Sequence, residues 1–588
     1  MITFDDAPNL NALWARLTMA EFVRSGARHV VVCPGSRSTP LALAAHASGL
    51  DLVVALDERG AAFHALGIAK ATGCAAPVIT TSGTAVANLL PAAVEAWASG
   101  IPMIVLTADR PPELLECGAN QAIPQRDVLG RFARWSVDLG CPTDAVDARV
   151  VLSTAAEAWN RAHTVPCGAV QVNCPFREPL GLQEAAWNRA TLDSIRAWIG
   201  STAPWRAEAC FGGGPGLLAA LRAVTRGSSR GVIVAGALPD EAERDAALIL
   251  AARLGWPVIA DIASGLRGVP TALARVIAHG DLVLRSDAAQ RALAPDAILR
   301  VGGALTSKAV TQWIDASRVR PVLVGRHAQR QDPSHTAAFS LDVDLAALAR
   351  DLVNSQPEAL PAAPSALTDS FVQADLAAAA AIGAWMESTD DLSEPWIAWW
   401  IAQHAPAGVL LAGNSMPVRD LDMHAPVRRD LVVLGQRGAS GIDGLIATAS
   451  GIARSGAPTT ALIGDVSALH DLSSLELLRR TPGRCTLAIV NNDGGGIFHF
   501  LPVAQQPVPF ETLFGTPHGC SFGGAASMFS LPYARASTRD EATRALQQAW
   551  SSRAPAIVEL VTPRADNLGR HRALQAAVTL AVDAALAG

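Results

Sequence analysis

The sequence predicts an α/β protein with three domains, each a doubly wound parallel sheet covered by helices on both faces. Short apolar runs alternate with amphipathic helical patterns along the whole chain. Strands that alternate with full helices form parallel sheets, because the crossover helix returns the chain in the same direction. At 588 residues the chain is also too long for a single hydrophobic core.

The predicted strands are short apolar runs bounded by turn residues. In chain order they span residues 29–34, 52–56, 77–81, 102–108, 231–236, 257–262, 281–285, 297–303, 321–325, 408–413, 431–435, 459–465 and 485–491.

Two stretches with weaker patterns separate the predicted domains. One ends at the glycine cluster FGGGPG, 211–216, and the other, 354–370, carries three Pro and is typical of a linker. The predicted domains are therefore 1–185, 205–352 and 371–588.

The first and third domains follow one plan, which indicates an internal duplication. In both, a first strand ends at a Gly-containing turn, a later strand runs through a Gly turn into a helix, and the next strand ends in polar residues. The corresponding positions are Gly35 with Gly413, Gly83 with Gly464, and Thr107 with Asn491.

The composition favours a cytoplasmic protein and excludes several other classes. Charged residues make up 17% of the chain and the net charge is −6, without a basic tract for nucleic acid. No apolar run has the length of a membrane span, and the acidic start lacks the features of a signal peptide. The nine cysteines contain no CxxC pair, which indicates reduced thiols and neither a disulfide framework nor a zinc site.

Polar residues follow two predicted strands of the third domain. Asp465 comes directly after one strand, and Asn492 follows the next, at the start of the glycine-rich run NNDGGGIF. Ligands of open parallel sheets bind at the carboxyl ends of the strands. A carboxylate, an amide oxygen and a backbone carbonyl of the glycine run are hard ligands that suit Mg²⁺. The alternative is a helix cap beside an unrelated turn.

Other phosphate-binding motifs are absent or incomplete. The sequence contains no GxxxxGK[ST], and its GGGPG cluster is not the GxGxxG that follows a strand in dinucleotide-binding domains. The run GQRGASGIDG, 435–444, offers a backbone able to approach a ligand, or a plain glycine-rich connection.

Glu58 is the candidate acid of the first domain. It stands where a strand runs into an amphipathic helix, between Asp57 and Arg59. A Glu in the first turn of a helix ordinarily stabilises the helix dipole or caps it. The alternative is a carboxylate that faces a cofactor ring.

Six motifs together resemble the thiamine-diphosphate enzymes and, among them, the synthases that make 2-succinyl-5-enolpyruvyl-6-hydroxy-3-cyclohexene-1-carboxylate (SEPHCHC) in the menaquinone pathway. The resemblance spans all three domains and is densest at 31–125 and 410–502. The motifs are CPGSRSTPLALA, LDERGAAFHALGIAKA, TTSGTAVANLLPAAVEA, LTADRPPELLECGANQAI, RGASGIDG and NNDGGGIF.

The resemblance implies a role for each domain and a reaction. Domain 1–185 would bind the aminopyrimidine of thiamine diphosphate, and 371–588 its diphosphate with Mg²⁺ or Mn²⁺. In such enzymes these two domains come from different subunits, so a homodimer is expected, or a homotetramer. The implied reaction is decarboxylation of 2-oxoglutarate and conjugate addition of the succinyl carbanion to isochorismate, with release of CO₂, for menaquinone or phylloquinone biosynthesis.

The resemblance also implies roles for single residues. Glu58 would hydrogen-bond the aminopyrimidine and promote formation of the reactive cofactor. Asp465, Asn492 and the carbonyl of Gly494 would bind the metal. The remaining cofactor contacts would be Ser415, Ile442, Ile497 and Phe498.

The implied substrates each carry two carboxylates, which Arg recognises well. The implied substrate-binding residues are Ser36, Arg37, Arg110, Gln121, Lys308, Arg419 and Arg437. The alternative for any one Arg is a solvated or structural ion pair.

The chain departs from the family pattern at three places. Ala309 follows Lys308 where some relatives carry a second basic residue, so one carboxylate contact is in doubt. Gln436 replaces a common Asn. Asp493 adjoins Asn492, although we expect its side chain to point to the other side.

Two other functions are compatible with parts of the pattern. One is a different thiamine-diphosphate enzyme, such as an acetolactate synthase-like carboligase or a 2-oxo acid decarboxylase, against which the Arg-rich loops argue. The other is a non-catalytic binding protein with the same fold. The presence of Glu58, Asp465 and Asn492 together argues against that.

Overall fold

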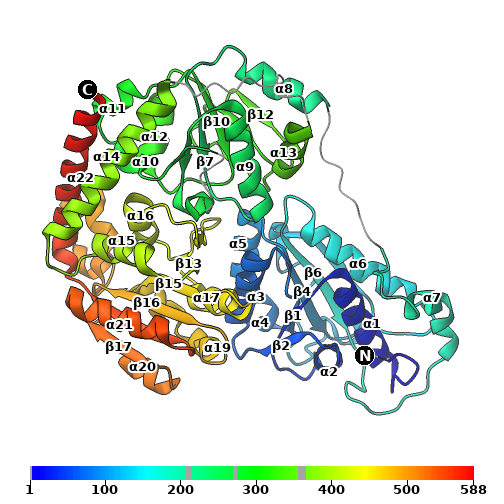
Figure 1. Cartoon of the computed structure of the whole chain (residues 1–588). Helices are drawn as coiled ribbons and strands as arrows, with labels where there is room; N and C mark the ends of the chain where they lie inside the picture. The colour runs from blue at the N-terminus through cyan, green and yellow to red at the C-terminus, as the bar shows by residue number, and fades with distance from the viewer. Residues whose placement is uncertain (1–2, 207–214, 269–273, 355–365, 588) are drawn as a thin grey trace. The chain divides into compact units, whose positions relative to one another are not determined.

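The computed structural model describes residues 3–206, 215–268, 274–354 and 366–587, and within them it confirms the predicted α/β class. The strands form three six-stranded sheets, and every strand pair is parallel. Helices cover these sheets (Figure 1). The chain divides into two compact units. One comprises Met1–Cys210, Ser450–Ser455 and Ser473–Arg480, and the other comprises Phe211–Ala449, Gly456–Leu472 and Thr481–Gly588.

The sheet of the first unit has the strand order β2-β1-β3-β4-β6-β5. Its strands are β1 (His29–Val32), β2 (Asp51–Val54), β3 (Val78–Thr80), β4 (Met103–Asp109), β5 (Ala133–Asp138) and β6 (Ala169–Pro175). Its helices are α1 (Leu10–Ser25), α2 (Thr39–Ala47), α3 (Glu58–Thr72), α4 (Thr84–Ala87), α5 (Leu90–Ser99), α6 (Arg149–His163) and α7 (Arg196–Ile199).

Alternating strand residues build the core of the first unit. Val30, Val32 and Ile79 point to one face of the sheet, where they pack against α1 and α6. Helices α3 and α5 contact the sheet but lie outside this cluster, so they cover the opposite face. The sheet is therefore covered on both faces, as a buried parallel sheet requires.

The second unit contains the central sheet, with the order β12-β11-β10-β7-β8-β9. Its strands are β7 (Gly231–Ala235), β8 (Val258–Ala260), β9 (Val276–Ile277), β10 (Ala297–Val301), β11 (Val322–Val324) and β12 (Phe339–Leu341). Its helices are α8 (Pro215–Thr225), α9 (Glu241–Leu254), α10 (Gly280–Val283), α11 (Asp287–Ala292), α12 (Lys308–Ala316) and α13 (Leu345–Asn354).

The C-terminal sheet has the order β14-β13-β15-β16-β18-β17. Its strands are β13 (Gly408–Ala412), β14 (Leu431–Gly435), β15 (Thr459–Gly464), β16 (Cys485–Asn491), β17 (Tyr533–Ala536) and β18 (Ala556–Val561). The helices of this part are α14 (Ala366–Ser388), α15 (Glu394–His404), α16 (Met416–His424), α17 (Leu445–Arg454), α18 (Asp465–His470), α19 (Leu475–Arg479), α20 (Gly523–Met528), α21 (Arg539–Ser551) and α22 (Arg564–Ala587).

The first and C-terminal sheets have the same strand order. Counted from the first strand of each, both run second, first, third, fourth, sixth, fifth. The internal duplication predicted from three pairs of turn positions is thus confirmed at the level of topology.

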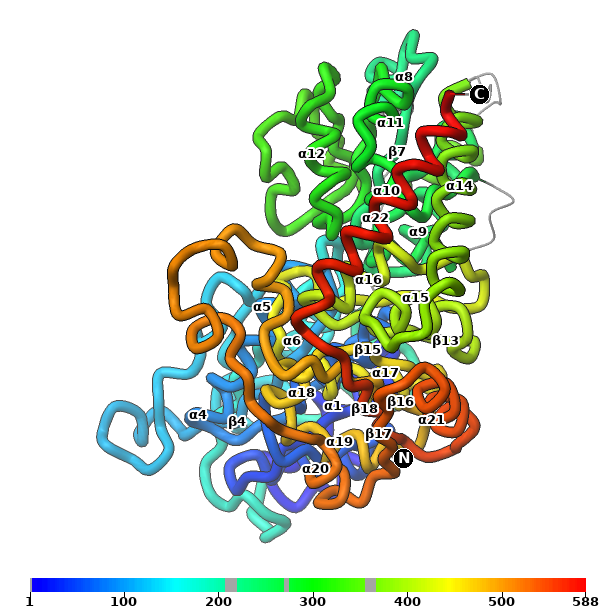
Figure 2. The backbone as a smooth tube through the Cα atoms, turned by 90° about the vertical axis from the view of Figure 1, so that its left-hand side faces the viewer, coloured from blue at the N-terminus to red at the C-terminus, as the bar shows by residue number. Residues whose placement is uncertain are grey.

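Two long helices tie the second unit together. Helices α14 and α22 run side by side in both views (Figures 1 and 2). Their buried side chains belong to one hydrophobic cluster that also includes Val232 and Val234 of β7, and Leu410 of β13. The central and C-terminal sheets therefore share a core.

Three sequence-based expectations differ from the structure. The strand predicted at 281–285 is wrong, because α10 occupies Gly280–Val283 and a short, fully buried apolar run does not distinguish strand from helix. The predicted linker 354–370 is partly helical, since α14 begins at Ala366; its remainder, 355–365, lies outside the described residues, as does most of the glycine cluster. Strands β5, β6, β9, β12, β17 and β18 were not predicted, and β6 was missed because Gln171 and Asn173 interrupt its apolar run.

The domain boundaries 1–185, 205–352 and 371–588 stay a prediction. None of the helices in the described ranges is long and apolar enough to cross a membrane.

Candidate active site

A cavity of about 470 Å³ lies at the carboxyl ends of β13, β15 and β16 in the second unit. The parallel register of β15 and β16 brings Gly464 opposite Val490, so the residues that follow both strands meet at one edge. Nine predicted site residues line this cavity: Ser415, Arg419, Arg437, Ile442, Asp465, Asn492, Gly494, Ile497 and Phe498.

Asp465 lies at the junction of β15 and α18 and is 2% exposed. Its Oδ1 accepts a hydrogen bond from the Val466 N–H at 2.7 Å, and its Oδ2 accepts from the Gly494 N–H at 2.9 Å. Nε2 of His518 lies 3.1 Å from the same Oδ2. Because Nδ1 of His518 accepts the Cys520 N–H, the ring proton is on Nε2 and points to Asp465.

The two polar atoms of the Asn492 side chain are in different environments. Nδ2 donates to Oε1 of Glu394 at 2.7 Å, whereas Oδ1 is buried and has no hydrogen-bond partner within the described residues. Burial, followed by the negative charge of Asp420, raises the pKa of Glu394. An unpartnered buried oxygen carries a desolvation cost that a bound cation would remove.

The glycine run after Asn492 lies too close to neighbouring backbone to carry side chains. A Cβ at Gly494 would lie 2.0 Å from the Gly515 carbonyl oxygen, and one at Gly495 would lie 2.2 Å from the Phe514 carbonyl oxygen. Gly494 also has φ +126, which favours glycine. Its carbonyl accepts one hydrogen bond from the Gly496 N–H at 3.0 Å, which leaves a second lone pair.

Asp493 faces away from the cavity, as the sequence predicts. Its Oδ1 accepts the N–H groups of Gly519 at 2.7 Å and His518 at 2.9 Å. These bonds, that of Gly519 foremost, lower the pKa of the exposed Asp493 carboxyl.

Two guanidinium groups enter the cavity near the end of β13. Arg419 donates from Nη1 to the Ser415 carbonyl at 2.5 Å, and Arg437 donates from Nη1 to Asn414 Oδ1 at 3.1 Å. Burial and the neighbouring Arg437 charge lower the pKa of Arg419. Ser415 itself has φ +70, an uncommon conformation for a residue other than glycine.

Gln436 fills the place where the family pattern has Asn. It is 1% exposed, and its Nε2 donates to the Asp443 carbonyl at 3.1 Å. The Asn414 side chain donates to the carbonyls of Gln436 and Gly441, at 2.9 and 2.6 Å. Gln436 thus stabilises the loop that carries Arg437 and Ile442.

A second cavity of about 450 Å³ adjoins the first, since Met416, Arg419 and Ile497 line both. Lys308 lines it from the first turn of α12, and Arg572 lines it from α22. Arg572 belongs to none of the sequence motifs named above. Arg285, also in the lining, is already paired with Asp281 at 2.7 Å.

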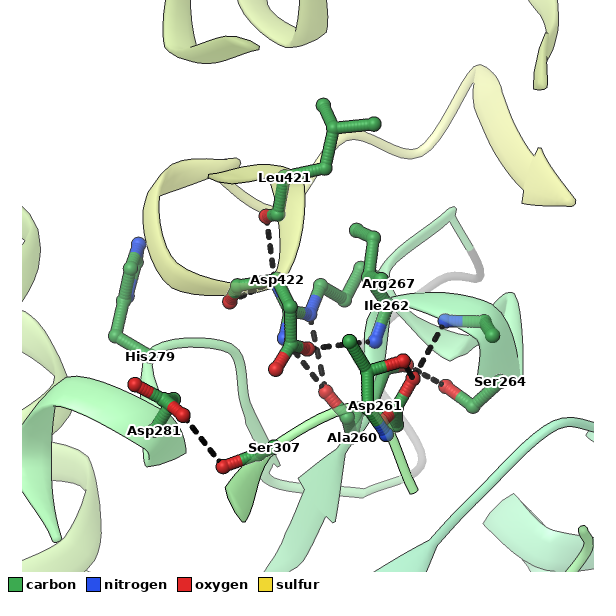
Figure 3. A network of polar contacts seen from close by, with 12 residues as sticks. Ala260, Asp261, Ile262, Ser264, Arg267, His279, Asp281, Ser307, Leu421 and Asp422 are labelled. Carbon is green, nitrogen blue, oxygen red and sulfur yellow. Dashed lines mark hydrogen bonds and ion pairs between the residues drawn. The ribbon is translucent and has the colours of Figure 1, made fainter. Parts of the chain in front are cut away.

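A buried polar network fixes the two helices that carry Arg419 and Lys308 (Figure 3). Arg267 donates to Asp422 Oδ1 of α16 at 2.7 Å and to the Ala260 carbonyl at 2.8 Å. Ser307, the N-cap of α12, donates to Asp281 Oδ2 at 2.6 Å. Both sides of the Arg267–Asp422 pair are 4% exposed, so the loss of one partner would leave a buried charge.

Glu58 is the first residue of α3 in the first unit, but it does not cap the helix. Asp57 is the N-cap, and its Oδ1 accepts the N–H groups of Arg59 at 2.9 Å and Gly60 at 3.3 Å. Within the described residues the Glu58 carboxylate makes no hydrogen bond. Capping is therefore excluded for Glu58, whereas the other alternative, an acid in the first turn that interacts with the helix dipole, still stands.

Predicted substrate residues gather at the carboxyl ends of β3 and β4 in the first unit. The Arg110 guanidinium donates to Ser82 Oγ, and Gln121 Nε2 donates to the Ser82 carbonyl at 2.9 Å. Burial and the positive charge of Arg37 lower the pKa of Arg110. Arg37 donates to the Phe176 carbonyl at 2.9 Å, while its buried Nε has no partner within the described ranges.

Ser36 contributes differently from the other predicted substrate residues. Its carbonyl accepts the Thr39 hydroxyl at 2.7 Å in the turn before α2, and its side chain is exposed.

Sequence reasoning missed Glu394, Asn414 and His518, which contact predicted site residues directly. Glu394 stands before Pro395 at the start of a helix, where Glu is common for reasons of helix stability. Asn414 follows Gly413, in the strand-end turn that corresponds to the turn at Gly35. His518 belongs to a loop without any regular pattern, so nothing in its sequence neighbourhood indicated its proximity to Asp465.

Two parts of the chain match known family models. Residues 15–128 match the family described as "Thiamine pyrophosphate enzyme, N-terminal TPP binding domain". Residues 189–391 match "Middle domain of thiamine pyrophosphate". The three parallel sheets thus have the architecture of thiamine-diphosphate enzymes.

Curated relatives are similar to the chain over almost its full length. Proteins named 2-succinyl-5-enolpyruvyl-6-hydroxy-3-cyclohexene-1-carboxylate synthase are 42% identical in Salinibacter ruber, with 98% of each chain covered, and 43% identical in Rubrobacter xylanophilus, with 97% of this chain and 99% of the relative covered. The protein of that name from Myxococcus xanthus is 40% identical, with 96% and 97% covered.

Proposed function

The chain belongs to the 2-succinyl-5-enolpyruvyl-6-hydroxy-3-cyclohexene-1-carboxylate (SEPHCHC) synthase family of thiamine-diphosphate-dependent enzymes, and we propose that it carries out the reaction in that name. It would decarboxylate 2-oxoglutarate and join the remaining four-carbon unit to isochorismate, which yields SEPHCHC and CO₂. We place this reaction in menaquinone or phylloquinone biosynthesis. The cytoplasmic location stays a prediction.

One observation carries the proposal: Oδ1 of Asn492 is buried without a partner within the described residues, and Asn492 lines the cavity together with Asp465 and Gly494. One carboxylate oxygen, one amide oxygen and one carbonyl suit Mg²⁺ or Mn²⁺, which complete their coordination with phosphate oxygens and water. The chain's own residues therefore fit a cation that holds a diphosphate.

The lining residues fit the rest of thiamine diphosphate. Ile442, Ile497 and Phe498 offer apolar contacts to the rings, and Ser415 offers polar contacts at the end of β13. When bound, this cofactor supplies an electron sink for cleavage beside the carbonyl of a 2-oxo acid. Glu58, whose carboxylate is not needed for capping, would hold a proton at the aminopyrimidine ring.

The basic side chains near the cavities suit substrates that carry two carboxylates. Arg419, Arg437 and Lys308 line the two adjoining cavities of the second unit. Arg37, Arg110, Gln121 and Ser36 belong to the first unit, where two guanidinium groups lie near each other despite their repulsion. Clustered, partly desolvated Arg side chains are typical of carboxylate recognition.

The basic residue that some relatives carry after Lys308 is replaced by Ala309, which is buried and 9% exposed. Arg572, which lines the same cavity as Lys308, is the candidate replacement for that charge.

We also propose that the protein is at least a homodimer, since in enzymes of this type two subunits complete each site.

The direct test is the consumption of isochorismate by purified protein with Mg²⁺, with and without 2-oxoglutarate and thiamine diphosphate. We expect isochorismate loss only when both are present, with an equal amount of CO₂ released. Isochorismate that persists while 2-oxoglutarate is decarboxylated would contradict the acceptor and leave a decarboxylase. Turnover of pyruvate alone would favour an acetolactate synthase-like enzyme.

A further inference from the structure

Asn492 can bind a cation only if its amide presents the oxygen, and one contact decides this. The amide group is planar, so the position of Nδ2 fixes that of Oδ1. Nδ2 lies 2.7 Å from Glu394 Oε1, and Oδ1 is the buried atom without a partner within the described residues. The acceptor on Glu394 therefore selects the orientation that a cation requires.

We propose that Glu394 is a positioning residue, which holds the Asn492 amide with its oxygen toward the cation. This inference rests on the proposed function. Glu394 is 4% exposed and comes from the first turn of α15, far from Asn492 in the sequence. Because Oε1 of Glu394 accepts from Nδ2, the amide nitrogen is the atom held at the carboxyl group and the amide oxygen is the atom left over.

Packing around Nδ2 serves the same orientation. A Cβ at residue 496 would lie 2.5 Å from Nδ2 of Asn492, so Gly496 leaves the space that the amide nitrogen occupies. Helix α15 is fixed in turn by its packing against α16, the helix that carries Arg419. The groups that orient a metal ligand typically change metal affinity about 10- to 100-fold when they are removed.

The preceding residue provides a natural control. Asn491 Nδ2 also donates to a buried carboxylate, Glu559 Oε1, at 2.7 Å. However, Asn491 Oδ1 already accepts the Asp493 N–H at 3.1 Å, whereas Asn492 Oδ1 has no partner within the described residues. The two Asn–Glu pairs match in distance, and both carboxyl groups are buried, but the pairs differ in whether the amide oxygen already has a hydrogen-bond partner.

The test is Mn²⁺ binding followed by electron paramagnetic resonance, in the presence of thiamine diphosphate, for the full chain. We expect Glu394→Leu to weaken Mn²⁺ binding about 10- to 100-fold. Glu394→Gln keeps a carbonyl acceptor for Nδ2 and should lose much less. Glu559→Gln, which alters the neighbouring pair, should bind Mn²⁺ like the wild type.

A coupling measurement separates positioning from general damage to the fold. In an Asn492→Ala background, Glu394→Leu should add little further loss of Mn²⁺ affinity, since the ligand that it positions is gone. Thermal unfolding without cation identifies any variant that has lost its fold. If Glu394→Leu does not fold, the Mn²⁺ affinity of Glu394→Gln is compared with that of the wild type.

The outcomes distinguish this inference from the proposed function. Wild-type protein that binds no Mn²⁺ with thiamine diphosphate would overturn both. The role of Glu394 alone would be overturned if the wild type binds Mn²⁺ normally and folded Glu394→Leu binds it with the same affinity. It would also be overturned if Glu394→Leu lost as much Mn²⁺ affinity in the Asn492→Ala background as it does with Asn492 present.

Discussion

Two neighbouring carboxylates at the start of α3 have separate tasks. Asp57 accepts the N–H groups of Arg59 and Gly60 and thereby caps the helix. Glu58 is free of this duty, which is why an acid at a helix start, ambiguous in the sequence, becomes a catalytic candidate in the structure. Capping is thus assigned to Asp57, and Glu58 keeps only the weaker stabilising interaction of a first-turn acid with the helix dipole.

We predict that Glu58→Gln lowers turnover at least 100-fold, the order expected when proton transfer by a side chain is lost. Binding of thiamine diphosphate with Mg²⁺ should change little, because the proposed diphosphate and cation ligands lie on the C-terminal sheet. Single-turnover kinetics and calorimetry measure the two effects separately.

Asp57→Asn is the matched control for Glu58→Gln, since it also turns a carboxylate into an amide but keeps the oxygen that caps α3. It should retain near wild-type turnover. If Glu58→Gln turned over as fast as this control, Glu58 would have no part in the chemistry.

At the scale of elements, α1 of the first unit is pinned by a buried carboxylate near its C-terminal end. Glu21 is fully buried, accepts the Trp198 indole N–H at 3.0 Å and accepts the Trp205 N–H at 2.8 Å. Burial raises the pKa of Glu21 to about 7, against an ordinary value of 4.5. Between about pH 4.5 and 7 the Glu21 carboxyl is therefore protonated in the folded protein and ionised in the unfolded chain.

This shift predicts how the stability of the first unit depends on pH. The stabilising contribution of Glu21 is fully present below about pH 4.5 and is lost as the pH rises through about 7. Between pH 5 and 8 the wild type should therefore lose stability relative to Glu21→Gln, which does not titrate. Denaturant unfolding of both proteins at each pH measures this difference, and a difference independent of pH would refute the assignment.

The glycine-rich connection after β16 shows how an element builds a site. In the sequence, the run NNDGGGIF is compatible with a metal-binding loop and with a plain turn. In the structure, Gly494, Gly495 and Gly496 each lie against atoms that would meet a Cβ at 2.5 Å or less. The glycines are therefore required by close packing, and that packing fixes Asn492 beside the cavity.

At the scale of the whole molecule, the sequence predicted the class, the parallel sheets and the shared plan of the first and C-terminal sheets. These features follow from the regular alternation of strands and helices, which can be seen in short stretches of the sequence. The strand predicted at 281–285 failed because a buried one-turn helix is as apolar as a strand. Strand β6 was missed because it carries two buried polar residues, Gln171 and Asn173, whose side chains form hydrogen bonds with Thr107 of the neighbouring strand β4.

The same division applies to the site. Asp465 and Asn492 were predicted from their places at strand ends, because topology brings strand ends together, whereas Ser415 was expected from the family resemblance. Their partners Glu394 and His518 were not, since their contacts cross long sequence separations and depend on three-dimensional packing. Local pattern and the family resemblance thus indicated the residues proposed to touch the cofactor, and the fold added the side chains that contact them.

The central claim is that the cavity beside β15 and β16 holds a divalent cation and a diphosphate. Calorimetric titration of thiamine diphosphate into the intact protein tests it most directly, with Mg²⁺ or with a chelator. We predict tight binding that requires Mg²⁺ and that is weakened about 100-fold or more in Asp465→Ala, since even the loss of a group that orients a metal ligand can cost that much. Asp493→Asn, which alters the adjacent outward-facing carboxylate, should bind like the wild type. Equal affinity in Asp465→Ala, or wild-type binding that survives chelation, would contradict the account.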